Sequence, residues 1–526
     1  MMRYRPLAPP LRLTALLLML VPQALPAQHD PERNATRHLA ANRPAQARKQ
    51  LAEANPDDSE RHFVAMLLAL HEGRTEAAIE AAQAALSAGL PFGRLVAGPR
   101  ELLEPVRASA EFAEWRQANP TQLVHGPMLG CVTDDGASFW VRTAGPATVR
   151  VRLFAEDEQQ PIESPTAKTT AETDFTAVVR ASGLRPSTTY RYEVSIDDQP
   201  VRNPGQRLRT SPKQGEPGRF SIAFGGGAGF VPERERMWNV IAEQRPDALL
   251  MLGDNVYIDD PKHSMTQRYC YYRRQSRPEW RSLVAATPTY SIWDDHDFAT
   301  NDCIPGAAID KPAWKRRVWQ VFQQNWVNPG YGGGNAQPGC WYDFTIADVH
   351  FLMLDGRYYR SREGTPSMLG AAQKEWLFDR LENTTARIKV IASPVPFSPG
   401  VKPGSKDTWD GFSEEREALF DLIEEQQING VILLAADRHR SDLRVTKRPD
   451  SYDLYEFESS KLTNRHTHPV VKTDQLLWGY NAKCSFGLVT FDTTKADPEI
   501  LFEVVDIDGE RVHSHTLYAS DLRRDG

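Results

Sequence analysis

The chain has 526 residues, of which 25% are charged, a mean hydropathy of −0.50 and a net charge of −7, the values of an ordinary soluble protein. At this length it is expected to hold more than one domain. Its acidic balance excludes non-specific nucleic-acid binding, which needs a basic face. Past the N-terminus, no apolar run is long enough to cross a membrane.

The first 27 residues are typical of a secretory signal peptide. Three arginines precede a short apolar run, LTALLLMLV, and a small-residue cleavage site ends at Ala27. We therefore expect a periplasmic or secreted protein. Five cysteines in an oxidising compartment allow two disulfides and one leftover thiol, and the sequence does not give the pairing.

Residues 28–119 are predicted to be helical. Alanines recur at helical spacing in PAQARKQLAEANPDD and again in TEAAIEAAQAALSAG, with an amphipathic helix, HFVAMLLALHEG, between them. The pattern resembles tetratricopeptide-type helical hairpins, two units at most. Two readings stay open: a surface that docks a protein partner, and a small helical bundle that caps the rest of the chain.

Residues 120–212 change to a period of two, which favours short strands separated by Gly, Pro and Asp turns. GLRPSTTYRYEV resembles the final-strand signature of fibronectin type III-like sandwiches. The alternative is any other small β-sandwich.

Residues 213–526 alternate strands and helices, which predicts an α/β sandwich with helices outside two central sheets. The last strands, SFGLVTFDTT and EILFEVVDIDG, are expected to extend a second sheet. The segment from Pro396 to Trp409, rich in Pro, Gly and Lys, is expected to be an active-site loop.

Three apolar runs in this last region end on polar clusters. DALLMLGD ends on Asp254, TPTYSIWDD ends on Asp294 and Asp295, and GVILLAADRH ends on Asp437 and His439. Buried strands tolerate such groups only just past their ends, where ligands bind in open α/β sheets. The three clusters therefore predict one metal site built from distant parts of the chain.

These clusters resemble the motifs of the calcineurin-like metallophosphoesterases, and more closely those of the alkaline phosphatase D (PhoD-like) family. The matching positions are Asp254, Tyr257, Trp293 to Asp297, Asn301, Leu354 to Arg357, Asp437 and His439. The resemblance implies a metallophosphoesterase-type αββα sandwich. It further implies hydrolysis of phosphate esters by a metal-activated water, with iron and calcium as the metal ions and their number left open.

The resemblance also assigns roles to residues. The predicted metal ligands are Asp254, Tyr257, Asp295, Asp437 and His439, while His296, Asn301 and Arg357 would stabilise the phosphoryl oxygens or the leaving group. The expected partner is a small-molecule phosphate ester, with no nucleic acid and no membrane. The helical N-terminal region leaves room for a protein partner.

One part of the sequence departs from the family pattern. The first strand ends in a glycine turn, Gly225 to Gly229, where the family places a cysteine or aspartate ligand. The site then either holds one metal or uses a backbone group or water in place of this side-chain ligand. The glycine run itself is either a tight turn or a loop that binds phosphate through its backbone amides. His466 and His468 are within reach of the site, although a histidine pair in a loop is more often structural. The alternative function is a phosphatase-fold binding protein with a degenerate metal site.

Overall fold

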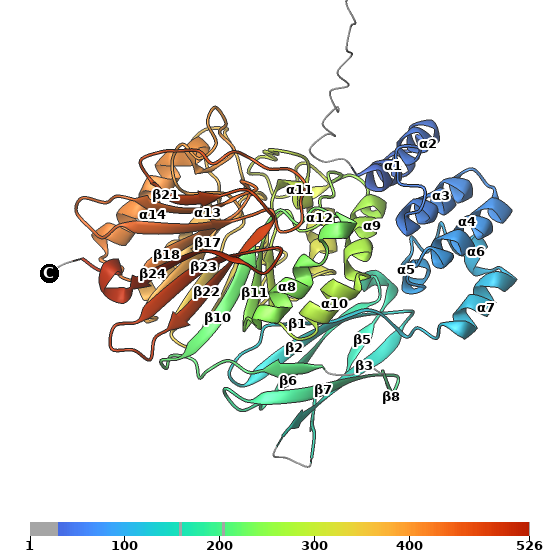
Figure 1. Cartoon of the computed structure of the whole chain (residues 1–526), viewed down its shortest axis with the longest axis horizontal. Helices are drawn as coiled ribbons and strands as arrows, with labels where there is room; N and C mark the ends of the chain where they lie inside the picture. The colour runs from blue at the N-terminus through green and yellow to red at the C-terminus, as the bar shows by residue number, and fades with distance from the viewer. Residues whose placement is uncertain (1–29, 157–159, 202–205, 525–526) are drawn as a thin grey trace, which may run out of the picture.

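The computed structural model describes residues 30–156, 160–201 and 206–524, and the chain forms three neighbouring units (Figure 1). The predicted signal peptide, residues 1–27, lies outside the described residues. Within the described part, no helix combines the length and the apolar character that a membrane span requires. All five cysteines are free thiols, so neither of the two allowed disulfides is present.

The first unit is helical. In α3, Asp58 caps the N-terminus by accepting a 2.9 Å hydrogen bond from the backbone N–H of Glu60. Helix α1 packs against α9 of the third unit. The likeness to tetratricopeptide repeats stays a prediction. The helices are α1 (Pro31–Ala40), α2 (Pro44–Leu51), α3 (Ser59–His71), α4 (Thr75–Ser87), α5 (Gly93–Ala97), α6 (Glu104–Arg107) and α7 (Ala110–Ala118).

The second unit is a pair of β-sheets that share an apolar core. One sheet has the order β1-β2-β6 and the other β4-β3-β7-β8, with β5 beside β3 and β9 beside β7. Along β3 and β7, buried side chains alternate with more accessible ones, most of them half-buried, as the period of two predicts. The fibronectin type III likeness stays a prediction. The strands are β1 (Leu123–Gly130), β2 (Gly136–Thr143), β3 (Ala147–Ala155), β4 (Ile162–Glu163), β5 (Ala167–Thr169), β6 (Thr176–Ser182), β7 (Thr189–Ile196), β8 (Gln199–Pro200) and β9 (Arg207–Arg209).

The third unit is built on two large sheets, the first with the order β12-β11-β10-β22-β23-β24. Strands β10, β11 and β12 are parallel neighbours, and β22 joins the free side of β10 antiparallel. The C-terminal strands therefore extend this first sheet, not the second sheet as the sequence predicted, because β10 offers them an open edge. The strands are β10 (Arg219–Gly225), β11 (Ala248–Leu252), β12 (Thr289–Ile292), β22 (Ser485–Asp492), β23 (Glu499–Asp506) and β24 (Arg511–Tyr518).

The second large sheet has the order β15-β16-β17-β18-β20-β19-β21. Phe457 on β20 stacks on Phe502 on β23 with ring centroids 4.3 Å apart, so the core lies between the two sheets. Its strands are β15 (Tyr342–Ile346), β16 (Val349–Met353), β17 (Ile388–Ala392), β18 (Val431–Ala435), β19 (Ser441–Thr446), β20 (Leu454–Ser459) and β21 (Leu476–Tyr480); β13 (Gly332–Gly333) and β14 (Gln337–Pro338) pair separately.

Helices lie outside these two sheets (Figure 1). Because β11 and β18 are buried on both faces, their sequences ALLML and VILLA are continuous apolar runs. The helices are α8 (Met237–Gln244), α9 (Ser264–Gln275), α10 (Pro278–Val284), α11 (Asp295–Phe298), α12 (Lys315–Gln323), α13 (Ala371–Asn383) and α14 (Ser413–Glu425).

Candidate metal centre

The polar clusters that follow β11, β12 and β18 gather at one edge of the third unit. Asp254 follows β11, Asp295 follows β12, and Asp437 and His439 follow β18. Strands β11 and β12 are parallel neighbours in the first sheet, and β18 lies in the second. An isolated bridge between the residues that follow β10 and β20 joins the two sheets at this edge. The loops therefore meet because the carboxyl ends of these strands point the same way.

The first group of ligand-type side chains consists of Asp254, Asp295 and His296. Their donor atoms all lie within 4.8 Å of one another, and all three residues are buried. Asp254 Oδ1 has no hydrogen-bond partner among the described residues. Burial, partly offset by the nearby His296 charge, raises the pKa of Asp254 well above its usual value, and Asp295 adds to the rise. A buried carboxylate of this kind calls for a cation, so the group fits a metal ion.

The sequence around Asp254 locks its loop to the loop that carries Asp295. Gly253 has a φ of +104°, and a Cβ there would lie 2.6 Å from the Cβ of Asp294, so only glycine fits. Asp297 accepts a 2.8 Å hydrogen bond from the backbone N–H of Asn255, whose side chain donates to the Ile292 carbonyl at 2.8 Å. These bonds hold the two carboxylates of the first group at a fixed separation.

His296 is held from two sides. Its Nδ1 lies 2.6 Å from Oδ1 of Asp259, whose Oδ2 lies 2.5 Å from Nη1 of Arg33, and the Tyr257 ring stacks on the imidazole with centroids 4.6 Å apart. Burial alone would lower the pKa of His296, but the two carboxylates of the first group outweigh it and hold that pKa well above its usual value. Because Arg33 lies on α1, the helical unit contributes a side chain to the site.

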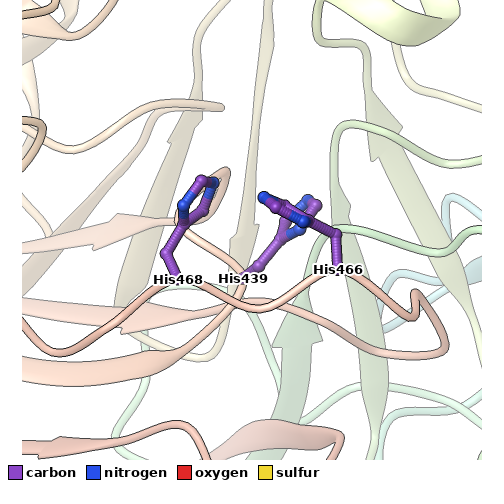
Figure 2. Close-up of side chains that lie close together, drawn as sticks. All are labelled: His439, His466 and His468. Carbon is purple, nitrogen blue, oxygen red and sulfur yellow. The ribbon is translucent and has the colours of Figure 1, made fainter. Parts of the chain in front are cut away.

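Tyr257 connects the first group to a second one. Its hydroxyl lies 2.8 Å from Nε2 of His439. His439, His466 and His468 form the second group, with donor atoms within 4.8 Å of one another, and Figure 2 shows the three imidazoles side by side. Burial holds the pKa of His439 well below its usual value, so the ring is neutral, the form that binds metal. Tyr257 is thus positioned between a carboxylate group and an imidazole group.

Four of the predicted ligands have left-handed backbones. The φ angles are 53° at Asp254, 48° at Tyr257, 67° at Asp437 and 49° at His439. Each non-glycine residue in such a conformation costs on the order of 1–3 kcal/mol and persists only where the surroundings impose it. Such strain concentrates at functional sites, so this concentration at the strand ends supports a functional assignment.

A third group combines three carboxylates with a lysine. Donor atoms of Asp295, Asp302 and Asp407 lie within 4.8 Å of one another. Lys402 Nζ lies 2.9 Å from Oδ1 of Asp302 and 3.5 Å from Oδ2 of Asp407. Lys402 belongs to the segment from Pro396 to Trp409, so that segment does border the site. Asp295 is shared with the first group, which places the lysine charge beside it.

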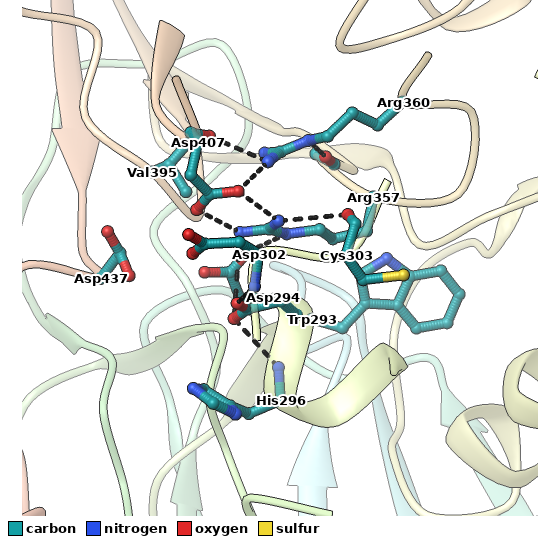
Figure 3. Close-up of polar contacts among 12 residues, drawn as sticks. Trp293, Asp294, His296, Asp302, Cys303, Arg357, Arg360, Val395, Asp407 and Asp437 are labelled. Carbon is teal, nitrogen blue, oxygen red and sulfur yellow. Dashed lines mark hydrogen bonds and ion pairs between the residues drawn. The ribbon is translucent and has the colours of Figure 1, made fainter. Parts of the chain in front are cut away.

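Arg357 lies beside this third group, and two carboxylates and the Cys303 carbonyl contact its guanidinium (Figure 3). Its Nε lies 2.5 Å from Asp294 Oδ1, and Nη1 and Nη2 lie 2.8 and 3.0 Å from the two oxygens of Asp407. The side chain is completely buried. In this arrangement Arg357 fixes Asp294 and Asp407, and its Nη2 also lies 3.9 Å from Oδ1 of Asp295. The predicted role of Arg357 toward a phosphoryl oxygen stays a prediction.

Two other predicted residues lie at the margin. Asp437 stands apart from the cluster of Arg357 and Asp407 in Figure 3 and pairs with Arg438 at 3.0 Å. Burial opposes its ionisation, but the Arg438 and Lys402 charges outweigh burial and hold the pKa of Asp437 at about 2. Asn301 is exposed and makes no hydrogen bond to another residue that the structure describes.

Three amides of the glycine turn after β10 are bonded within the protein, as in a tight turn. The backbone N–H of Gly227 donates to the Gly253 carbonyl at 3.3 Å, and that of Ala228 donates to the Asp254 carbonyl at 2.8 Å. The N–H of Gly226 donates to the Ser459 carbonyl at 3.3 Å. These amides are satisfied within the protein, so the phosphate-binding alternative is wrong for them.

Reasoning from the sequence missed three residues at the site. Arg33 and Asp259 hold His296, and Asp407 holds Arg357. Each lies outside the recognised motifs. The one signal was composition: the Pro-, Gly- and Lys-rich segment that contains Asp407 and Lys402 was expected to border the site.

Comparisons with known proteins agree with this geometry. A family model for PhoD-like phosphatase matches residues 222–492, just over half of the chain, and a model for a domain of unknown function (DUF7800) matches residues 120–214. Alkaline phosphatase D of Bacillus subtilis (strain 168) is 24% identical over 357 residues, which cover 57% of this chain and 60% of that protein. Purple acid phosphatase 15 of Arabidopsis thaliana is 23% identical over 207 residues, 38% of this chain and 37% of that protein. The chain thus spans less than two thirds of the length of either relative.

Two solved structures share the fold. A structure of PhoD superposes with a TM-score of 0.60 at 19% identity, covering 74% of this chain and 92% of that one. Purple acid phosphatase PPD1 from yellow lupin (Lupinus luteus) seeds superposes with a TM-score of 0.58 at 11% identity, covering 75% of each chain. The predicted α/β class is confirmed in this form: a mixed α/β fold similar to that of these phosphatases.

Proposed function

The chain belongs to the PhoD-like phosphatase family, and we propose that it is a metal-dependent phosphoesterase that hydrolyses small-molecule phosphate esters. The observation that carries the proposal is the first group, in which Asp254, Asp295 and His296 converge from two strand ends and Asp254 Oδ1 is buried without a partner among the described residues. Buried polar atoms of stable proteins are mostly hydrogen-bonded, so an unpartnered carboxylate oxygen close to a second buried carboxylate calls for a cation.

The donor set fits metal ions. Asp254, Tyr257, Asp295, Asp437 and His439 are the residues that we propose as ligands, and His439 Nδ1 is a second buried atom without a partner among the described residues. Carboxylate oxygens suit calcium, while the imidazole and the phenol suit iron, the two ions that the family resemblance implies. When bound, such ions act as Lewis acids and lower the pKa of water.

The remaining residues position these groups or the substrate. His296 lies beside Asp254 and Asp295, and these carboxylates hold its pKa well above the usual value. Its charged form is suited to bind a phosphoryl oxygen or to protonate a leaving oxygen. Asn301, in an exposed turn, is proposed for the same anion. Arg357 is proposed for the same anion as His296 and also orients Asp294, and Lys402 supplies a cation at the partly exposed side of the site.

The wider organisation is also part of the proposal. We propose a signal peptide over residues 1–27, a helical unit over 28–119, a fibronectin type III-like sandwich over 120–212 and a catalytic domain over 213–526. The expected location is the periplasm or the exterior, with a phosphate ester as the only required partner. A protein partner for the helical unit stays the alternative use of that region.

The test is the variant Asp254→Asn, compared with the wild type for bound metal and for turnover of p-nitrophenyl phosphate and bis-p-nitrophenyl phosphate. We expect metal and activity to be lost together, while the chelated variant unfolds no earlier than the chelated wild type, because a buried charge has been removed. Asp474→Asn, at an exposed aspartate, is the control. Wild-type activity in Asp254→Asn would contradict the proposal, and a metal-free, inactive wild type would favour the binding-protein alternative.

A further inference from the structure

We propose that His439, His466 and His468 bind a transition-metal ion, with the two histidines of the loop after β20 replacing the ligand that the glycine turn after β10 lacks. The inference deepens the proposed function, and it rests on that function only for the catalytic use of the ion. Whether the histidines bind metal is a separate question with its own measurement.

The glycines of the turn give the histidine loop, residues 460–469, room to approach. Gly227 has a φ of +67°, and a Cβ there would lie 3.0 Å from the backbone nitrogen of Lys461. At Gly229 a Cβ would lie 3.1 Å from Cγ of Asn464. Any side chain at these positions, including a metal ligand, would push the loop outward. The missing ligand and the close approach of the histidine loop are therefore one structural feature.

Backbone hydrogen bonds fasten the histidine loop to the turn. Three of them, together with one hydrogen bond from a side chain, run directly between the two segments, so the loop is docked on the turn and does not merely pass nearby. They are Leu462 N–H to the Gly226 carbonyl at 3.0 Å, Thr463 N–H and Asn464 N–H to the Gly227 carbonyl at 3.4 and 3.1 Å, and, from a side chain, the Thr463 hydroxyl to the Gly229 carbonyl at 2.6 Å.

The part of the loop that carries the two histidines is also fixed. The backbone N–H of His466 donates to Oδ1 of Asn464 at 2.9 Å, and Nδ2 of Asn481 donates to the His468 carbonyl at 3.0 Å. Lys461 Nζ reaches the Thr467 hydroxyl at 2.7 Å. Ligands held in this way by their neighbours lose little conformational freedom when an ion binds.

The three imidazoles are available as ligands. Their donor atoms lie within 4.8 Å of one another, and the ring centroids of His466 and His468 lie 5.2 and 5.6 Å from that of His439 (Figure 2). Among the described residues, His439 Nδ1 is buried without a partner, and no ring nitrogen of His466 or His468 hydrogen-bonds to protein. The backbone N–H of His439 donates to the Ser460 hydroxyl at 3.0 Å, which fixes this ligand to the start of the loop.

The chemistry of three imidazoles selects the class of ion. Imidazole nitrogen suits zinc, iron, copper and nickel, whereas calcium takes oxygen ligands. Three histidines also leave a coordination position open, as catalytic zinc sites do. Because His466 and His468 are only half-buried, that position is reachable from solvent. Calcium would then belong to the carboxylate groups and the transition metal to the imidazole group.

The test uses the full chain, stripped of metal with a chelator and titrated with Co²⁺ alone. The visible absorption of bound Co²⁺ and the cobalt content per chain are measured for the wild type, for His466→Ala/His468→Ala and for His466→Gln/His468→Gln. The control is His513→Ala/His515→Ala, which removes a pair with the same spacing on β24 that no third ligand-type side chain joins within the described residues. The glutamine pair keeps side-chain volume, so it guards against a folding defect in the alanine pair.

We expect both loop variants to bind Co²⁺ at least roughly tenfold more weakly, since even removing an outer partner of a metal ligand costs 10- to 100-fold. The control should keep wild-type affinity and absorption. Wild-type cobalt content and spectrum in the glutamine pair would overturn the inference. Turnover of p-nitrophenyl phosphate on the same samples separates the two proposals. A wild type that is inactive but binds cobalt through these histidines would contradict only the proposed function. An active wild type whose loop variants still bind cobalt would contradict only this inference.

Discussion

The chain of contacts from Arg33 through Asp259 to His296 predicts that the helical unit tunes the site. Arg33→Met removes the guanidinium and keeps most of the side-chain volume. Both members of the Arg33–Asp259 pair are buried, with side chains 5% and 9% exposed. Removing one partner of a buried ion pair lowers the free energy of unfolding by roughly 3–5 kcal/mol. Because His296 still bonds the other oxygen of Asp259, we expect the low end, about 3 kcal/mol.

The same substitution should slow catalysis without releasing metal. The guanidinium of Arg33 donates to Asp259 and, at 3.1 Å, to the backbone carbonyl of Tyr257. A carbonyl contact does not hold the phenol oxygen of Tyr257, so metal content should not change, whereas loss of an outer partner typically costs about 10- to 100-fold in activity. Burial would raise the pKa of Asp259, but the His296 contact and the Arg33 charge outweigh it and lower that pKa. Without Arg33 the pKa of Asp259 rises. As the pH falls, the Asp259 carboxylate is therefore protonated, and its ion pair with His296 is lost, at a higher pH than in the wild type. The acidic limb of the activity profile should move to higher pH.

The assay is kcat and KM for p-nitrophenyl phosphate across pH, with Arg43→Met as the control at an exposed arginine of the same unit. We expect kcat to fall and KM to stay nearly constant. A double-mutant cycle with His296→Gln gives the sharper test, because residues that act through one another are not additive. Additive effects of the two substitutions, or a kcat within about twofold of the wild type in Arg33→Met, would refute the reasoning.

Two further predictions concern stability. A Cβ at Gly226 would lie 2.7 Å from the Cβ of Ala436 and 2.9 Å from the Gly253 carbonyl oxygen. Gly226→Ala should therefore lower the free energy of unfolding, measured in urea, by about 1–3 kcal/mol. The control Gly145→Ala, with open space around it, should be nearly neutral, and equal losses in the two variants would count against the packing argument. Burial, helped by the Asp30 charge, raises the pKa of Glu32 from 4.5 to about 7. Between these two pH values the free energy of unfolding therefore falls by roughly 3 kcal/mol as the pH rises, at about 1.36 kcal/mol per pH unit. Glu32→Gln should therefore stabilise α1 at pH 8 and not at pH 4, as followed by hydrogen exchange, and equal protection at both pH values would disprove it.

The sequence by itself determined the strands of the catalytic unit and the position of the metal-type residues along them. Continuous apolar runs such as ALLML and VILLA require burial on both faces, and a carboxylate is then tolerated only past the strand end. The side of the sheet that the C-terminal strands join did not follow, since strand patterns do not say which edge is free.

Only the tertiary structure decided which side chains complete the site. Arg33 and Asp259 are 226 residues apart in sequence, and the histidine loop meets a turn more than 230 residues before it. No periodicity or local motif records such a meeting, because it depends on how whole layers pack. The same holds for Arg357: its place at a strand end is readable in the sequence, but the carboxylates that occupy its guanidinium come from two other loops. Local pattern fixes where a side chain emerges, and the packing of distant elements fixes what it touches.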